Sequence, residues 1–150
     1  MTSLLLFLEQ ANYRRVPLTR NGVGHFETDG TLQGRAVRVL IDTGAANTVI
    51  NLPLAQELGL DMQVLDMKGG GAGGANLDVF QVNDPNLQLD DVTPHLPICF
   101  AIDLSHVNEA LVQRGTTPTD IVLGVDVFDK QEAIIDYGSS SLFLKFSEEM

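Results

Sequence analysis

The sequence predicts a mostly β domain with two short helices. Short runs rich in β-branched and aromatic residues alternate with clusters of glycine, asparagine and aspartate, the pattern of strands separated by turns. Only two segments carry helix signals. The chain has 150 residues, which is enough for one domain with a hydrophobic core and too few for two. We expect one domain over residues 16–147, after an N-terminal segment, residues 1–15, whose order the sequence leaves open.

The first half of the chain is expected to hold three strands, a turn and a helix. The strands cover residues 22–28, 36–41 and 48–50, and the turn covers Thr28–Thr31. Leu52–Leu58 is expected to be helical, because Pro53 suits a first helical turn and Gly59 suits the position after the last one.

In the second half, a glycine-rich segment over residues 68–74 separates two expected strands, 64–67 and 77–82. This pattern favours a mobile hairpin, and a plain flexible loop is the alternative. Asp103 or Ser105 should cap a helix that runs through Arg114 and is ended by Gly115. The remaining strands are expected at 87–92, 96–102, 121–125, 133–137 and 142–146.

The charge of the chain argues against several kinds of partner. Nine basic and twenty acidic residues give a net charge of −11, which disfavours binding to nucleic acid or to an anionic membrane surface. The apolar run Leu4–Leu8 is too short to span a bilayer and lacks the basic flank of a signal peptide. We therefore expect a cytoplasmic protein.

Most of the chemically versatile residues are scattered. His25, His95 and His106 show no metal-ligand spacing, so neither a metal site nor a cofactor is expected. Cys99 is the single cysteine, which excludes an intrachain disulfide, and its apolar surroundings favour a buried, unreactive thiol.

Asp42 stands out because it directly follows the apolar strand end Val39–Ile41. A carboxylate at the tip of a buried strand is costly unless hydrogen-bond donors meet it. Gly44 can offer its backbone N–H to that carboxylate, and the Thr43 hydroxyl can hold the loop. Asp-Thr-Gly can also be an ordinary turn, and the motif alone does not separate the two interpretations.

A second motif, Leu123-Gly124, ends another apolar run 82 residues after Asp42. With this pair of motifs the chain resembles the retropepsin-like aspartic proteases of bacterial and cellular type, which are single-lobed relatives of pepsin. The resemblance implies a closed, barrel-like β lobe with a flap hairpin and two short helices. It also implies a catalytic Asp42, a supporting loop of Thr43, Gly44 and Ala45, and a backing strand with Leu123 and Gly124. The flap would comprise Gly69, Gly70, Gly71, Ala72, Gly73 and Gly74.

The same resemblance implies a function and an assembly. Enzymes of this family use two carboxylates that share one proton around a water molecule. Because this chain has a single Asp-Thr-Gly, a homodimer would supply the second Asp42, and the strand at 142–146 is a candidate for the intersubunit sheet. The substrate would be an extended peptide or protein segment. Two alternatives stay open: a catalytically weak or inactive peptide-binding dimer on the same fold, and a structural β domain.

The sequence departs from the viral members of that family at two places. Viral members pair an acidic residue after the active-site alanine with an arginine after the later glycine. These positions are Ala46 and Val125 here, so both charges are absent together. The segment 85–120 is also longer than the compact viral enzymes need, and the sequence assigns it no role.

Overall fold

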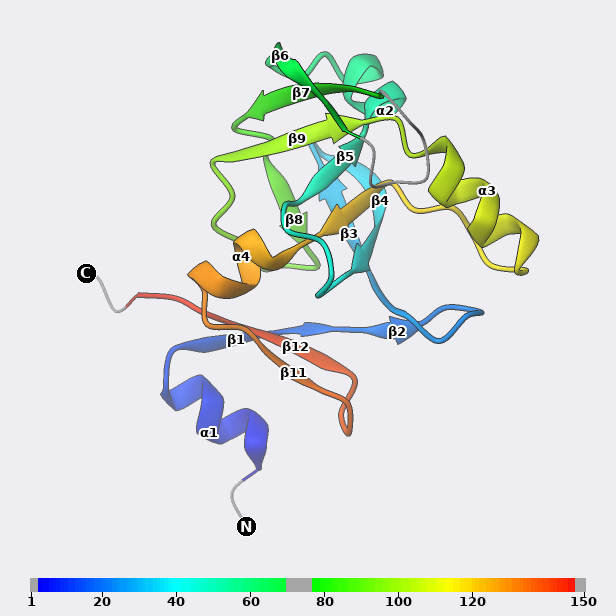
Figure 1. Ribbon diagram of the computed structural model, residues 1–150. Helices are drawn as coiled ribbons and strands as arrows, with labels where there is room; N and C mark the ends of the chain where they lie inside the picture. Colours follow the sequence, from blue (N-terminus) through cyan, green and yellow to red (C-terminus); the bar gives the residue numbers. More distant parts are fainter. Residues whose placement is uncertain (1–2, 70–76, 148–150) are drawn as a thin grey trace.

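In the part of the chain that the structure describes, four helices surround a large and a small β-sheet (Figure 1). The structure, a computed structural model, describes residues 3–69 and 77–147. The large sheet has the strand order β2-β3-β4-β10-β5-β9-β7-β6, with β8 paired to β3 beside that path. In chain order its strands are β2 (Thr19–Arg20), β3 (Phe26–Leu32), β4 (Arg35–Ile41), β5 (Val49–Asn51), β6 (Met62–Gly69), β7 (Leu77–Asn83), β8 (Leu87–Leu89), β9 (Ile98–Ile102) and β10 (Ile121–Leu123).

The large sheet is open rather than closed. Within the part of the chain that the structure describes, its terminal strands β2 and β6 do not pair with each other. The closed, barrel-like lobe expected from the sequence is therefore wrong in this detail, although the mostly β class is confirmed. Two neighbouring pairs, β4 with β10 and β5 with β9, are parallel, and the other pairs are antiparallel.

The small sheet has the order β1-β12-β11 and lies below the large one in Figure 1. Its strands are β1 (Tyr13–Pro17), β11 (Ile134–Asp136) and β12 (Ser141–Lys145). The expected domain start at residue 16 falls inside β1. Both edges of β12 are already paired within the chain, so it cannot be the strand that extends a sheet into a partner. Among the described strands, β1 and β11 form the two edges of this sheet.

Two of the four helices were expected from the sequence. These are α2 (Leu52–Glu57) and α3 (Ser105–Gln113), and each is followed by a glycine with positive φ, Gly59 at +65° and Gly115 at +83°. The other two are α1 (Leu4–Gln10) and α4 (Val125–Lys130). The strand expected at 121–125 is correspondingly shorter, because the chain turns at Gly124 and begins α4. No helix in residues 3–69 and 77–147 has the length and apolar character needed to cross a bilayer.

The turn expected at Thr28–Thr31 is wrong, because these residues lie inside β3. The hairpin between β3 and β4 turns instead at Gln33 and Gly34, whose φ angles are +53° and +82°. Positive φ at both central positions is the geometry of a tight two-residue hairpin. Gly30 serves a different purpose: a Cβ there would lie 2.4 Å from the Gln88 carbonyl oxygen, so glycine lets β8 approach β3 closely.

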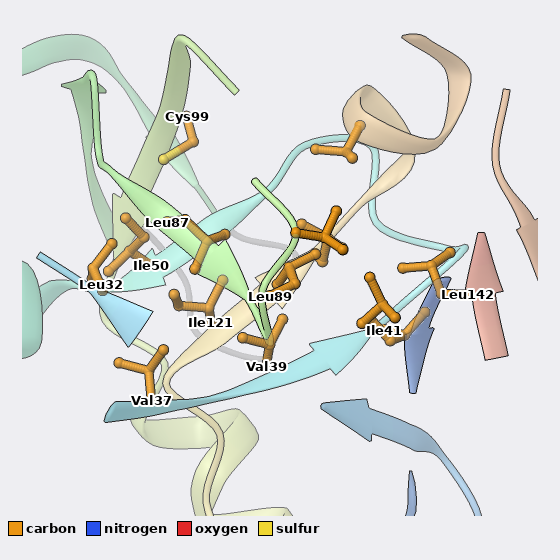
Figure 2. Packing of buried hydrophobic residues seen from close by; sticks show 14 of the residues in the cluster. Leu32, Val37, Val39, Ile41, Ile50, Leu87, Leu89, Cys99, Ile121 and Leu142 are labelled. Carbon is orange, nitrogen blue, oxygen red and sulfur yellow. The ribbon is translucent and has the colours of Figure 1, made fainter. Parts of the chain in front are cut away.

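The two faces of the large sheet carry different apolar groups. Val37, Val39 and Ile41 of β4 pack in the main core with Ile121 of β10 and Leu142 of the small sheet (Figure 2). Leu123 of β10 belongs to the same cluster. Side chains alternate across a strand. Leu40 and Val122 therefore point to the opposite face, where they form a second, smaller cluster with Leu104. The candidate site lies on this second face.

Cys99 lies on the core side of β9 and is fully buried. Burial raises the pKa of its thiol to about 12, and the negative charge of Asp126 adds to the effect. We expect the thiol to react with a disulfide reagent at pH 8 at least about a hundredfold more slowly in the native protein than in guanidinium. In a Cys99→Ala background, Ile98→Cys is the matched control, because Ile98 is exposed on the same strand. A native Cys99 that reacts as fast as Ile98→Cys would contradict the packing of β9.

Candidate active site

Asp42 follows β4 directly, in the loop that leads to β5. The parallel pairing of β4 with β10 sets Ile41 opposite Leu123, so the two sequence motifs meet at the same end of the sheet. The Asp42 N–H donates to the Leu123 carbonyl at 3.0 Å. This bond ties the start of the Asp-Thr-Gly loop to the end of β10.

The Asp42 carboxylate is held by its own loop. Its Oδ1 accepts a hydrogen bond from the Gly44 N–H at 2.8 Å. A Cβ on residue 44 would lie only 3.2 Å from that oxygen, so the glycine allows the close approach. Asp42 is half-buried, whereas Thr43 and Gly44 are exposed.

Gly124 braces the loop from behind. A Cβ at this position would lie 2.7 Å from the Ala45 carbonyl oxygen and 2.9 Å from the backbone of Asn47. The neighbouring Val125 N–H donates to the Ala45 carbonyl at 2.8 Å, and the Ala45 N–H donates to the Asp42 carbonyl at 3.2 Å. The structure therefore brings Asp42, Thr43, Gly44, Ala45, Leu123 and Gly124 together as the sequence suggested.

Hydrogen bonds between Thr48 and Asp126 also stabilise the loop, and the sequence did not predict them. Asp126 accepts hydrogen bonds from the Thr48 backbone N–H at 2.9 Å and from its hydroxyl at 2.8 Å. The Thr48 hydroxyl oxygen in turn accepts from the Gly124 N–H at 3.1 Å. Thr48 is fully buried, and Asp126 lies in the first turn of α4. Asp126 stands two positions after the motif glycine, but its partner Thr48 lies 78 residues earlier, and no local sequence pattern indicates the pairing.

These hydrogen bonds join the two motifs in a chain that lacks the viral charge pair. Ala46 is exposed and Val125 is half-buried, and neither carries a charge. Besides the backbone hydrogen bonds, a side-chain link between the Asp-Thr-Gly loop and the later motif runs through Thr48 and Asp126. A buried polar group needs such partners, because leaving it unpaired costs about 1–3 kcal/mol.

A pocket of about 500 Å³ opens beside Asp42, on the face of the sheet away from the main core. Its walls are mainly aliphatic and aromatic side chains from β4, β5, β7, β9 and β10 and from the start of α3. Among the described residues that line it, Asp42 is the only ionisable one. The apolar lining comes from Leu40, Val49, Val79, Phe100, Ile102, Leu104, Val107 and Val122.

A smaller hollow of about 230 Å³ lies on another side of Asp42. Asp42 and Thr43 line it together with His25, Ile135 and Tyr137. Tyr137 is strongly exposed, and its ring packs edge-on against Phe26 with the centroids 4.9 Å apart. The Asp42 loop is therefore accessible from two directions.

The other candidate residues are placed as follows. Gly69 is the last residue of β6, and the antiparallel pairing of β6 with β7 agrees with the expected hairpin. Gly70, Gly71, Ala72, Gly73 and Gly74 lie outside the described residues. His25, His95 and His106 are exposed and lie on separate segments. Across residues 3–69 and 77–147, no group of three or more His, Cys, Asp or Glu side chains could hold a metal ion.

The arrangement suits acid–base chemistry on a substrate that lies in the apolar pocket. A half-buried carboxylate at the pocket wall can take a proton from a water molecule or give one to a substrate. When carboxyl groups alone activate a water molecule for attack on a peptide carbonyl, two of them are needed, one ionised and one protonated. Among the described residues, the pocket contains one such group from this chain.

Comparisons with known proteins agree with this geometry. Residues 28–127 match the aspartyl protease family, a span that includes both motifs. An uncharacterized protein encoded in the cobV 5′ region of Sinorhizobium sp. is 45% identical over 38 residues, which cover 25% of this chain and 16% of that protein. The chain thus spans about a sixth of the length of that relative.

Two solved structures are similar in fold. The retroviral protease-like domain of Ddi1 from Leishmania major aligns with a TM-score of 0.53 at 18% identity, covering 82% of this chain and 94% of that one. A retropepsin-like aspartic protease from Rickettsia conorii aligns with a TM-score of 0.56 at 16% identity, covering 88% and 91%. Two motifs that meet at Asp42, a retropepsin-like fold and a family match over two thirds of the chain lead to one conclusion: this chain belongs to the aspartyl protease family.

Proposed function

We propose that this protein is an aspartic endopeptidase that works as a two-fold homodimer, with Asp42 of each subunit forming the catalytic dyad. The observation that carries the proposal is the half-buried Asp42 carboxylate, held by Gly44 at the wall of a 500 Å³ apolar pocket. One Asp42 would act as the base that activates water, and the other, protonated, would polarise the peptide carbonyl. The substrate is an extended peptide with apolar residues at the cleaved bond.

The single carboxylate that this chain contributes to the pocket, among its described residues, supports the proposed dimer. Two carboxylates that share a proton must come within about 3 Å of each other. A two-fold axis must then pass close to Asp42, and the exposed residues beside it, Thr43 and Gly44, would lie at the interface. Two subunits would bring two pockets to one continuous cleft.

The direct test is hydrolysis of a denatured protein mixture by the purified protein between pH 3 and 7, with and without pepstatin. We expect a bell-shaped dependence of rate on pH, because the dyad works with one shared proton. Pepstatin should abolish the activity. Binding of peptides without hydrolysis at any pH would instead favour the peptide-binding dimer, and neither binding nor hydrolysis would favour a structural domain.

Thr43→Arg tests the position of the interface. The substitution introduces a long charged side chain that would meet its own copy across the axis, so we expect a monomer in sedimentation and the loss of hydrolysis. Thr93→Arg is the matched control, because Thr93 is also exposed and lies away from the Asp42 loop. Wild type and control should sediment at about 33 kDa, twice the chain mass of 16.3 kDa. A dimeric, fully active Thr43→Arg protein would contradict the proposed axis.

A further inference from the structure

We propose that the start of helix α3 forms one wall of the substrate pocket, and that Val107 sets the largest apolar side chain the pocket accepts. This inference rests on the proposed function, since it concerns the substrate of the same site. It gives a role to part of the long segment 85–120, which the sequence left unassigned. The substrate class that follows is a peptide with an uncharged apolar side chain beside the cleaved bond.

The pocket wall is built from two directions. Leu40 of β4 and Val122 of β10 form its floor, where they pack with Leu104 in a cluster separate from the main core. Val107, about one turn further along the chain in α3, packs against this cluster and also lines the pocket. A side chain that enters beside Asp42 therefore meets the sheet on one side and α3 on the other.

β9 leads directly into this wall. Its Cys99 and Ala101 side chains belong to the main core, whereas Phe100 and Ile102 line the pocket, as strand alternation requires. α3 begins three residues after Ile102 and stands at the side of the large sheet (Figure 1). The apolar surface of the strand thus continues onto the helix.

Hydrogen bonds fix α3 in place. The Leu104 N–H donates to the Asn51 side-chain oxygen at 3.0 Å, which joins the start of the helix to the end of β5. The Asn108 side chain donates to the Thr119 carbonyl at 3.1 Å and accepts from the Thr119 N–H at 2.8 Å. Leu111, on the same helix, is buried. These contacts hold α3 in a fixed position beside the pocket. The size of the side chain at position 107 therefore determines the width of the pocket.

The lining also indicates which side chains fit. Apart from Asp42, the described residues around the pocket carry no ionisable group, so a charged substrate side chain would lose its hydration without gaining a partner. One methylene in an apolar pocket changes discrimination by about 10–200-fold. A change of residue 107 by two or more carbon atoms is therefore large enough to measure.

The test compares three peptides that differ only in one residue beside the cleaved bond, which is Ala, Leu or Phe. We expect Val107→Phe to lower kcat/KM for the Phe peptide relative to the Ala peptide by at least about tenfold. Val107→Ala should raise the same ratio. The ratio does not depend on how much of the enzyme is folded, so a merely structural effect would leave it unchanged. Val107→Ile is the conservative variant and should move the ratio in the direction of Val107→Phe by less.

Val112→Ala is the matched control for Val107→Ala. Val112 lies on the same helix and is 55% exposed, so its substitution changes helix propensity equally without touching the pocket. The ratio should equal that of the wild type. Equal ratios in all Val107 variants would overturn the inference and leave the proteolytic function intact.

Binding affinity of the same three peptides, measured by calorimetry on the Asp42→Asn background, provides the readout that does not depend on catalysis. If the relative affinities of the three peptides change with residue 107, the result supports Val107 as a pocket wall. If the wild type at the same time cleaves no peptide, only the proposed function is overturned. Affinities that do not respond to residue 107 overturn the inference.

Discussion

Asp42→Asn is expected to abolish peptide hydrolysis while leaving a folded protein of unchanged assembly. The amide cannot act as a base, and removal of a general acid–base group typically lowers the rate by about 10²–10⁴-fold. Stability should not fall, because the side-chain oxygen of the new amide can still accept the Gly44 N–H bond that holds the loop. In the proposed dimer the substitution also removes the repulsion between two crowded carboxylates. The measurements are kcat/KM on a cleaved peptide and the melting temperature.

Asp91→Asn is the control for the change in charge, since Asp91 is exposed and lies outside the pocket. It should keep the activity of the wild type. Full activity in Asp42→Asn, once contaminating protease is excluded, would remove the aspartic-protease interpretation. Mixing adds a test of the dimer. If subunits exchange freely in an equal mixture, about a quarter of the dimers carry two Asp42 residues, and activity per total protein falls to about a quarter of that of wild type alone.

Much of the site could be predicted because its signals are local. Asp42 after an apolar strand and Gly44 two residues later are neighbours in the sequence, and their hydrogen bond forms within one loop. The ends of α2 and α3 could also be predicted from the sequence, since Gly59 and Gly115 supply the positive φ that ends a helix. These features depend on the chemistry of a few adjacent residues.

The features that were missed depend on distant partners. Asp126 takes its role from Thr48, 78 residues earlier, and no local pattern indicates that pairing. Gly30 resembled a turn residue, but the Gln88 carbonyl requires a glycine there in the middle of a strand. α4 spans only six residues, too few for a helical period to separate it from the apolar strand before it. The pocket wall at Val107 likewise exists only when α3 packs beside β4 and β10.

Gly124→Ala is expected to destabilise the protein and to reduce hydrolysis at the same time. The added Cβ would meet the Ala45 carbonyl oxygen at 2.7 Å and the Asn47 backbone at 2.9 Å, and backbone atoms cannot rotate away as a flexible side chain can. The cause is steric alone, because φ of −117° at Gly124 is extended backbone that any residue adopts. Overpacking of this kind costs about 1–3 kcal/mol. For a domain of this size the melting temperature should fall by about 2–12 °C.

The loss of activity should exceed what unfolding explains, because the displaced atoms belong to the loop that carries Asp42. We expect kcat/KM to fall by at least about tenfold at a temperature well below the melting point, since small misplacements of a catalytic group are costly. Gly138→Ala is the matched control. Its new Cβ would meet only the Asp136 carboxylate, at an ordinary 3.5 Å, so stability and activity should stay near those of the wild type. A Gly124→Ala protein as stable and active as this control would mean that the Asp-Thr-Gly loop does not depend on close packing against Gly124.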